Sequence, residues 1–319
     1  MNHSPIQIST AQIEELLDFP SLIKALRDAF AGESHVPQRH HHDFPASSGC
    51  PDSTMLLMPA WQGKTFFGLK IVTITPDNHT RELPTIQGLY LLFDTITGSV
   101  LAQLEAKTLT NWRTAAASAL ASGYLSHPDS QTLLMVGTGS LASFLIHAHV
   151  SVRPIKKVLI WGRNSQKAER LAKKISNGTY SVEAVQSLES AVKSADIIST
   201  ATMSEQALIK GEWLRAGQHL DLVGSYKPNM READDDCIRK ANVFVDIRSS
   251  APKESGDLAI PIKKGLLSPE SILADLFELC QNKHRGRHSK EEITLFKSVG
   301  HALEDLAAAQ LIYRKWTQQ

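Results

Sequence analysis

Hydrophobic residues follow two different periods in the first third of the chain. Between residues 11 and 31, apolar side chains recur every three or four positions, which predicts one or two amphipathic helices broken near Pro20. Between His35 and Leu104, apolar runs are short, rich in β-branched residues and separated by Gly, Pro, Asp and Asn. The runs STMLLMPA, FFGLKIVTI and IQGLYLLFD therefore predict strands of a mainly antiparallel sheet.

The rest of the chain alternates short apolar runs with helical segments. The alanine-rich NWRTAAASALASGYL, after Leu109, predicts a tightly packed helix that leads into this second part. The runs KVLIW, DIIST, HLDLV and VFVDI, with helices predicted at Gln166 to Ile175 and Arg231 to Ala241, indicate a doubly wound parallel sheet. Apolar spacing from Lys290 to Trp316 predicts one long amphipathic helix that returns to the first part.

The segment QTLLMVGTGSLASFLIHAHV, residues 131–150, has the pattern of a dinucleotide-binding turn. An apolar run from Thr132 to Val136 predicts a buried strand, Gly137 permits a tight turn, and Gly139 lets a pyrophosphate approach the backbone. Ala142 allows helix and strand to pack closely, and the first helical amides face the anion. Because the motif is short, an ordinary strand-to-helix turn is the alternative.

The second strand of this unit bears on cofactor choice. An adenosine ribose with a free 2′-hydroxyl usually meets an acidic residue about 20 positions after the glycines. Here the sequence is WGRNSQK, in which Arg163, Asn164 and Lys167 offer the positive charge and donors that suit a 2′-phosphate. NADPH is therefore preferred and NADH is the alternative, since Arg163 can also be a solvated residue at a strand end.

Composition narrows the class of partner. The 319 residues, 42% apolar, suffice for two domains, and the net charge of +1 provides no overall field for nucleic acid or an anionic membrane. Cys50, Cys237 and Cys280 are odd in number and widely spaced, which favours a reducing compartment over disulfides or zinc. The first residues do not resemble a signal peptide and no apolar run has membrane-spanning length, so a cytoplasmic chain with a small-molecule partner is expected.

Two histidine-rich or basic stretches predict neither metal nor nucleic-acid binding. In a strand, neighbouring side chains of His40, His41 and His42 alternate between faces, which leaves at most His40 and His42 together and no metal site expected. The run KHRGRHSK, residues 283–290, has no interleaved aromatic residues and predicts a solvated loop before the last helix.

Three cations with apolar neighbours, Arg39, Lys70 and Arg113, lie in separate segments of the first part. A buried cation needs a partner, and a substrate carboxylate would provide one. Two or three charge-assisted hydrogen bonds, each worth about 1.5–3 kcal/mol, would supply much of the binding energy of a small acid. The alternative, left open here, is internal ion pairing. The acids considered for it are Glu82, Glu105 and Asp94.

Several strings in the same order resemble the ornithine cyclodeaminase and mu-crystallin family, over nearly the whole chain. They are PTIQGLYLLFDTITGSVLAQLEAKTLTNWRTAAASALA, GTGSLA, VGSYKPNMRE, KESGD and FKSVGHALEDLAAAQLIY. The resemblance implies an α/β protein with an N-terminal α+β domain for substrate binding and dimerisation, residues 1–113 with 292–319. It also implies a Rossmann dinucleotide-binding domain with a doubly wound parallel sheet, residues 114–291, and a homodimer.

By the same resemblance, Arg39, Lys70 and Arg113 hold the substrate carboxylate, and Lys70 and Arg113 are the expected catalytic residues. Thr85 and Gly300 complete the predicted substrate site. The predicted cofactor residues are Arg113, Thr114, Gly137, Thr138, Gly139, Ser140, Leu141, Trp161, Arg163, Asn164, Lys167, Thr200, Ala201, Thr202, Gly224, Ser225 and Val299.

The loop VGSYKPNMRE distinguishes members of the family. Cyclodeaminases place an aspartate after the paired glycines of this loop to act on the substrate amine, and here Tyr226 stands in that position. Cyclodeamination needs a base at the amine, whereas reduction of a cyclic ketimine needs an oriented carboxylate and a hydride at C2. The loop resembles that of the family's ketimine reductases. The source of the nitrogen's proton, among water, Lys70 and Tyr226, stays open.

The expected reaction is NAD(P)H-dependent reduction of Δ1-pyrroline-2-carboxylate to L-proline, with Δ1-piperideine-2-carboxylate to L-pipecolate as a second candidate. Three alternatives are weighed against it. They are an ornithine cyclodeaminase, which Tyr226 disfavours, an alanine-dehydrogenase-like enzyme that aminates pyruvate, and a non-catalytic binder of NADPH and an aromatic ligand. A pure binder would not need the three cations together.

Overall fold

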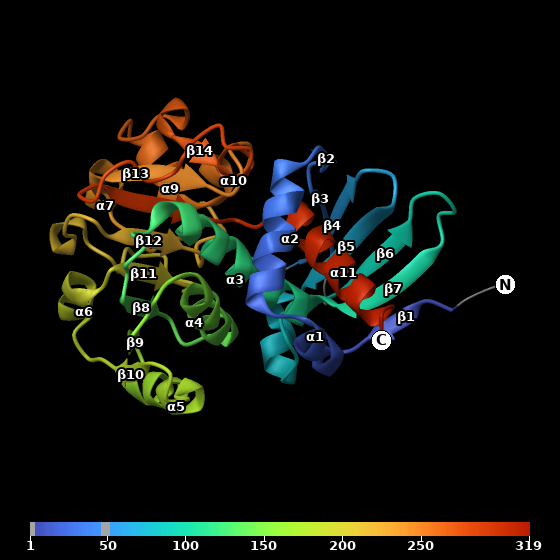
Figure 1. Cartoon of the computed structure of the whole chain (residues 1–319), viewed down its shortest axis with the longest axis horizontal. Helices are drawn as coiled ribbons and strands as arrows, with labels where there is room; N and C mark the ends of the chain where they lie inside the picture. Colours follow the sequence, from blue (N-terminus) through green and yellow to red (C-terminus); the bar gives the residue numbers. More distant parts are fainter. Residues whose placement is uncertain (1–3, 46–51) are drawn as a thin grey trace. The chain divides into compact units, whose positions relative to one another are not determined.

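The computed structural model describes residues 4–45 and 52–319, which form two compact units (Figure 1). The first unit comprises Met1–Arg113 and His301–Gln319, and the second comprises Thr114–Gly300. The chain therefore leaves the first unit within one helix, α3 (Ala106–Leu125), and returns to it near its end. Cys50 lies outside the described residues, and Cys237 and Cys280 are buried free thiols.

The first unit begins with the helices predicted for residues 11–31. They are α1 (Thr10–Leu16) and α2 (Phe19–Ala31), so the predicted break near Pro20 is confirmed. Pro20 lies in the first turn of α2, where its missing N–H removes no helical hydrogen bond. Asp18 caps the same turn by accepting a hydrogen bond of 2.8 Å from the Ser21 amide.

The first unit also contains the predicted sheet, in the order β1-β7-β6-β5-β4-β2, with β3 paired to β4. All pairs are antiparallel except β1 with β7. The strands are β1 (Ile6–Ile8), β2 (Ser34–His35), β3 (His40–Phe44), β4 (Ser53–Gln62), β5 (Phe66–Ile74), β6 (Ile86–Asp94) and β7 (Val100–Glu105), and the 3-10 helix η1 (Pro76–Arg81) joins β5 to β6.

The two faces of this sheet differ in burial. Met58, Lys70 and Tyr90 are register partners on the face that contacts α11 (Ala302–Trp316), and all three are buried. Figure 1 shows α11 crossing this sheet with α2 beside it. The opposite face carries apolar side chains that stay half-buried or exposed. They are Leu57, Pro59, Trp61, Phe67, Leu69, Ile71, Leu89, Leu91 and Phe93.

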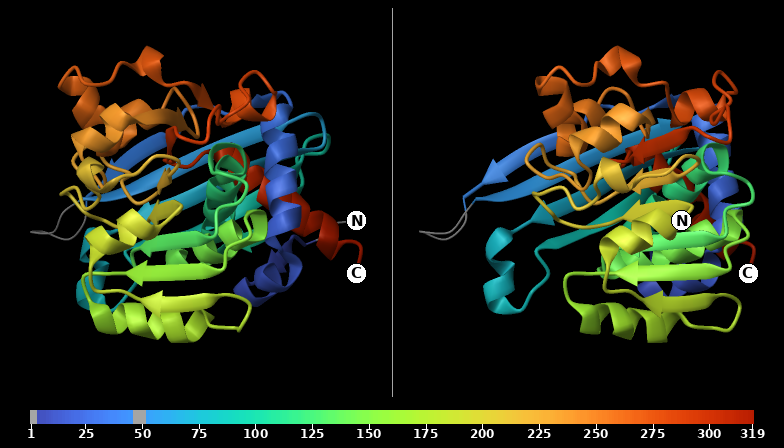
Figure 2. Two further views of the ribbon diagram at one scale, coloured as in Figure 1. Left: turned by 60° about the vertical axis from the view of Figure 1, so that its left-hand side comes forward. Right: turned by 90° about the vertical axis from the view of Figure 1, so that its left-hand side faces the viewer.

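The second unit is the predicted doubly wound parallel sheet, with the order β10-β9-β8-β11-β12-β15-β13-β14, and Figure 2 shows its strands as parallel arrows. Its strands are β8 (Thr132–Val136), β9 (Lys157–Trp161), β10 (Ser181–Ala184), β11 (Ile197–Thr200), β12 (His219–Leu222), β13 (Ala241–Val245), β14 (Ala274–Asp275) and β15 (Ile293–Lys297). Its other helices are α4 (Ser140–Val152), α5 (Ser165–Ile175), α6 (Leu188–Ser194), α7 (Asp235–Lys240), α8 (Ala251–Glu254), α9 (Gly256–Lys263) and α10 (Leu276–Cys280), with the 3-10 turns η2 (Gly211–Trp213) and η3 (Pro269–Ser271).

The prediction of one helix from Lys290 to Trp316 is wrong. Residues Ile293–Lys297 form β15, which lies between β12 and β13, and the helix begins only at Ala302. A strand covered on both faces is apolar without alternation, so its sequence does not distinguish it from a helical turn. The return to the first unit accordingly starts at His301 and not at residue 292.

The predicted helix from Arg231 to Ala241 is also shorter than expected. It comprises only Asp235–Lys240, because Asp234 is the N-cap and accepts a hydrogen bond from the Cys237 amide. The residues before Asp234 form a loop. Glu232 lies in this loop and is fully buried.

The basic run at residues 283–290 is a loop, as predicted, but it precedes β15 and is only partly solvated. Arg287 donates hydrogen bonds to the carbonyls of Leu125 and Gln218. Arg153 donates in the same way to the carbonyls of Ser122 and Gly123. These two guanidinium groups therefore satisfy carbonyls at the C-terminal end of α3, where positive charge is favoured. No helix among the described residues is long and apolar enough to cross a membrane.

Candidate active site

Two of the predicted substrate-binding cations lie in a buried ion cluster of the first unit. Lys70, on β5, places its Nζ 2.7 Å from Asp305 Oδ2. Arg113, on α3, places Nε 3.1 Å from Asp305 Oδ1 and Nη1 2.6 Å from Glu304 Oε2. Both acids are in the first turn of α11, and their side chains are 0% exposed.

The cluster is ionised because its charges compensate one another. Burial alone would raise the pKa of Asp305, but Arg113 and Lys70 outweigh burial and hold that pKa below its ordinary value. Burial lowers the pKa of Lys70 to about 8, against the opposing effect of Asp305. An ammonium group with this pKa exchanges its proton near neutral pH, which an ordinary lysine does not.

The third cation, Arg39, affects the same region. It lies just before β3 and is half-buried. Burial and the positive charge of Arg39 lower the pKa of His301 to about 4, against the opposing effect of Asp305. His301 is therefore neutral at pH 7, and Arg39 adds positive charge to the region of Lys70 and Arg113.

The acids considered from sequence as ion-pair partners have other contacts. Asp94 accepts hydrogen bonds from the Ile96 and Thr97 amides, and Glu105 accepts from the Lys107 and Thr108 amides. Glu82 is exposed and adopts a left-handed φ of 56°. Lys70 and Arg113 do form internal ion pairs, but the prediction that Glu82, Glu105 or Asp94 would be their partners is wrong.

Sequence reasoning did not single out Glu304 and Asp305. The signal was present in HALEDLAAAQ, where two adjacent acids interrupt a helix of small and apolar residues. Charged residues at otherwise buried positions need partners, so this pair could have been matched to the cations. Thr85, the other predicted substrate residue of this unit, is exposed and lies directly before β6.

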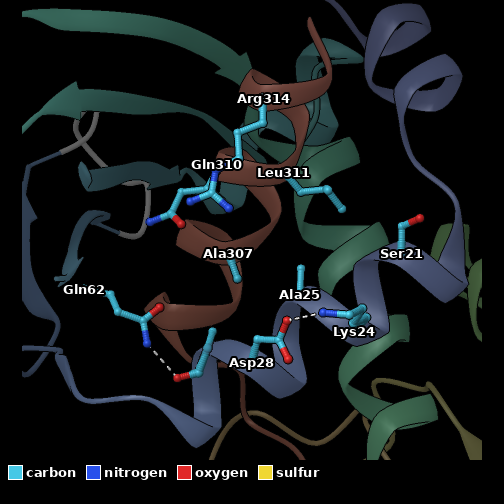
Figure 3. Close-up of a pocket in the computed structure, with 10 residues that line it drawn as sticks. Ser21, Lys24, Ala25, Asp28, Gln62, Ala307, Gln310, Leu311 and Arg314 are labelled. Carbon is cyan, nitrogen blue, oxygen red and sulfur yellow. Dashed lines mark hydrogen bonds and ion pairs between the residues drawn. The ribbon is translucent and has the colours of Figure 1, made fainter. Parts of the chain in front are cut away.

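A pocket of about 400 Å³ lies elsewhere in the first unit, between α2 and α11 (Figure 3). Its Lys24 and Asp28 pair with each other at 2.6 Å, and Gln62 donates to the Ala29 carbonyl. The residues that line this pocket include none of the buried cations.

The predicted histidine pair lies on one face of β3. The rings of His40 and His42 are 6.3 Å apart. In the ranges 4–45 and 52–319, no group of three or more potential ligands has the arrangement of a metal site.

The predicted phosphate loop of the second unit has the shape that an anion requires. Gly137 has a φ of +124°, and a Cβ there would lie 2.5 Å from the Ala201 carbonyl oxygen, so a side chain is excluded. A Cβ at Gly139 would meet no atom within 4 Å, which leaves that backbone open to a ligand. No side chain caps the first turn of α4, so its amides fit a pyrophosphate. Thr138, Ser140 and Leu141 surround this turn and are not buried.

The predicted adenosine end follows β9. Arg163 and Lys167 are exposed beside this strand end. Asn164 is the N-cap of α5, and its side chain accepts a hydrogen bond from the Lys167 amide at 3.0 Å. Trp161 donates its indole N–H to the Gln186 carbonyl. Arg163 and Lys167 therefore provide positive charge at this strand end, whereas the side-chain oxygen of Asn164 caps the helix.

The remaining predicted cofactor residues lie mainly at the carboxyl ends of the central strands, where ligands bind in open α/β sheets. Thr200, Ala201 and Thr202 end or follow β11, Gly224 and Ser225 follow β12, and Val299 and Gly300 follow β15. Thr114 lies in α3 and is buried. Tyr226 is 41% exposed in the loop after β12, and the Lys227 ammonium lies 5.7 Å from the centre of its ring.

Comparisons with known proteins agree with this arrangement. The Δ1-pyrroline-2-carboxylate reductase of Paracoccus denitrificans is 38% identical over 299 residues, 93% of each chain. The solved structure of the Thermococcus litoralis Δ1-pyrroline-2-carboxylate reductase in complex with NADH and L-proline matches with a TM-score of 0.90 and 32% identity over 98% of each chain. An archaeal alanine dehydrogenase dimer with bound NAD matches with a TM-score of 0.90 and 28% identity, over 98% of this chain and 96% of that one.

The family model described as ornithine cyclodeaminase/mu-crystallin family matches residues 5–319. Taken with the order of motifs and the two-unit fold, this match shows that the chain belongs to the ornithine cyclodeaminase/mu-crystallin family and is an oxidoreductase.

Proposed function

We propose that this chain reduces a cyclic ketimine carboxylate, Δ1-pyrroline-2-carboxylate, to L-proline. The observation that carries the proposal is the buried cluster of Lys70 and Arg113, whose directions Asp305 and Glu304 fix, with the positive charge of Arg39 acting on the same region. A small anionic substrate would accept hydrogen bonds from these cations. The Paracoccus relative and the Thermococcus structure, which holds NADH and L-proline, support the same assignment.

The cations keep donors for a substrate despite their internal ion pairs. A guanidinium has five N–H donors, and the ion pairs of Arg113 engage Nε and Nη1. An ammonium has three, and the pair with Asp305 engages one donor of Lys70. Asp305 and Glu304 thereby fix the direction of both side chains, which lowers the entropy lost when an acid binds.

Reduction of the imine needs one hydride at carbon and one proton at nitrogen. A bound reduced nicotinamide supplies the hydride to C2, and the electrons of the C=N double bond move to the nitrogen. Lys70 is the proposed proton donor, because its pKa of about 8 makes it a stronger acid than an ordinary lysine. Tyr226 stands where cyclodeaminases have an aspartate and brings no carboxylate base, which argues against ammonia loss.

The pH dependence of the reaction tests the role of Lys70. Lys70 is protonated below a pH of about 8, so kcat/KM for imine reduction should fall about tenfold per pH unit above it. In Lys70→Arg the side chain stays protonated, so the fall in kcat/KM should occur at higher pH, even if the maximal rate is lower. If the substrate itself titrates, kcat/KM would fall over the same pH range in both proteins. That result would exclude Lys70 as the proton donor.

A substrate panel tests the cations. We expect wild-type protein to turn over Δ1-pyrroline-2-carboxylate, and Arg39→Ala and Arg113→Ala to lower kcat/KM by about 10- to 100-fold, the loss of one charge-assisted hydrogen bond. Lys24→Ala is the control, because its ion pair with Asp28 is on the surface. Unchanged kinetics in both cation variants would contradict carboxylate binding there.

The same panel separates a second candidate function. The similarity to an archaeal alanine dehydrogenase favours amination of pyruvate as the alternative, since it extends over 98% of this chain. Oxidation of the reduced cofactor with pyruvate and ammonia, without any with the cyclic imine, would establish that alternative. Turnover of Δ1-piperideine-2-carboxylate in parallel would measure the preference for ring size.

We further propose that NADPH is preferred over NADH. The support is the exposed positive charge of Arg163 and Lys167 beside β9. The Thermococcus and archaeal structures hold NADH and NAD, so a preference for NADPH would distinguish this chain from them. Arg163→Ala should raise the KM for NADPH about tenfold and leave the KM for NADH within about twofold. Arg170→Ala, an exposed arginine on α5, is the control, and a wild-type preference for NADH would refute the assignment.

A homodimer is the proposed assembly, with a second copy covering the apolar sheet face of the first unit. Phe67 and Phe93 stack there with ring centres 4.4 Å apart, and Trp61 is 38% exposed. Apolar faces of this extent are usually buried by a partner, and one relative is described as a dimer. Leu91→Lys should sediment as a monomer, whereas Ile96→Lys, at an 86% exposed turn position, should not change the dimer. A monomeric wild-type protein would contradict this proposal.

The cytoplasmic location of the protein stays a prediction.

A further inference from the structure

Among the buried ionisable side chains of the second unit, four that the proposed chemistry does not use interact with one another. Glu232, Asp246, Asp257 and Lys297 are each 0% exposed. Burying a charge is costly unless hydrogen bonds or an opposite charge compensate it. Their hydrogen-bond partners therefore indicate what this group, here called the buried acid cluster, holds in place.

Glu232 bonds to the segments that follow two neighbouring strands. Its Oε1 accepts from the amide and the hydroxyl of Thr202, at 2.7 and 2.8 Å, just after β11. Its Oε2 accepts from the Gly224 amide at 2.7 Å and from the Ser225 amide at 3.3 Å, just after β12. One carboxylate thus fixes the distance between both segments.

The two segments approach so closely that no side chain fits between them. A Cβ at Gly224 would lie 2.1 Å from the Thr202 carbonyl oxygen and 2.5 Å from Glu232 Oε1. The glycine is therefore required by the approach of the two backbones to the carboxylate.

Asp246 performs the same task at the next pair of strands. It follows β13, and its Oδ2 accepts from the Val299 and Gly300 amides, both at 2.6 Å, just after β15. Gly300 has a φ of +83°, a conformation that side chains disfavour. The Ser298 hydroxyl donates to the same oxygen at 3.2 Å.

Asp257 and Lys297, the other two members of the cluster, stabilise the position of Glu232. Asp257 Oδ1 accepts from the Glu232 and Ala233 amides at 2.7 and 3.1 Å, and Lys297 Nζ lies 3.4 Å from Asp257 Oδ2. Burial raises the pKa values of Glu232 and Asp246, and the charge of Lys297 opposes this in both cases. Lys297 therefore favours the ionised forms of Glu232 and Asp246, which accept hydrogen bonds from several backbone amides.

We propose that Glu232 and Asp246 are positioning residues, which together set the three backbone segments 200–202, 224–225 and 299–300 for the nicotinamide end of the cofactor. This inference rests on the proposed function, because these segments are the ones predicted to line the nicotinamide. Neither carboxylate needs to touch the cofactor, since each acts through the amides it binds.

Glu232→Gln and Asp246→Asn test the proposal, because each replaces an acceptor oxygen with an NH2 group that faces backbone N–H donors. We compare the Kd of each nicotinamide dinucleotide with that of its matching ADP-ribose, which lacks the nicotinamide. The Kd of the dinucleotide should rise about tenfold or more, that of the ADP-ribose should change less than about twofold, and kcat should fall about 10- to 100-fold. Glu205→Gln, an exposed glutamate after β11, is the control and should change none of these.

A purely structural role would weaken the dinucleotide and the ADP-ribose equally, and that result would overturn the inference, as would unchanged values for both. If Glu232→Gln does not fold, Thr202→Val removes the hydroxyl bond to Glu232 and a longer bond from the Ser204 amide, and it should shift the same ratio of Kd values in the same direction. The ratio is measured without turnover. A wild-type protein that ignores the cyclic imine would therefore refute the proposed function and leave this test intact.

Discussion

The carboxylate of Asp305 is the contact on which the first unit depends, because it bonds to both Lys70 and Arg113. Removing one partner from a buried ion pair typically costs about 3–5 kcal/mol, since the other charge is left without compensation. Without α11, both cations would be buried without their carboxylate partners. The helix that completes the core of this unit therefore also keeps the proposed carboxylate-binding groups ionised and pointing in fixed directions.

The second unit solves a similar problem with backbone groups. Where the first unit surrounds cations with carboxylates, the second surrounds carboxylates with main-chain amides, as at Glu232 and Asp246. The phosphate loop reverses the arrangement, because the amides that open α4 lack a side-chain cap and Gly139 leaves room for a ligand. Amides at strand ends thus serve internal anions at one set of loops and suit an external anion at another.

The sequence predicted what local periodicity and turn chemistry determine. The antiparallel sheet, the crossover helix and the parallel sheet with its glycine turn follow from such patterns. Strand β15 did not, because ITLFK is buried on both faces and lacks alternation, and the helix after it extends the same apolar spacing. Glu304 and Asp305 were missed for another reason. Adjacent acids in a helix look solvated unless the distant cations that face them are known, and that pairing is tertiary.

The long separation in sequence between the members of the ion cluster has a consequence for how the protein is made. Lys70 and Asp305 are 235 positions apart, and all of Thr114–Gly300 lies between them. During synthesis on the ribosome, the second unit emerges and can fold while the first still awaits its last helix. The nascent chain can therefore complete its second unit before residue 305 has been translated, and its first unit is completed last.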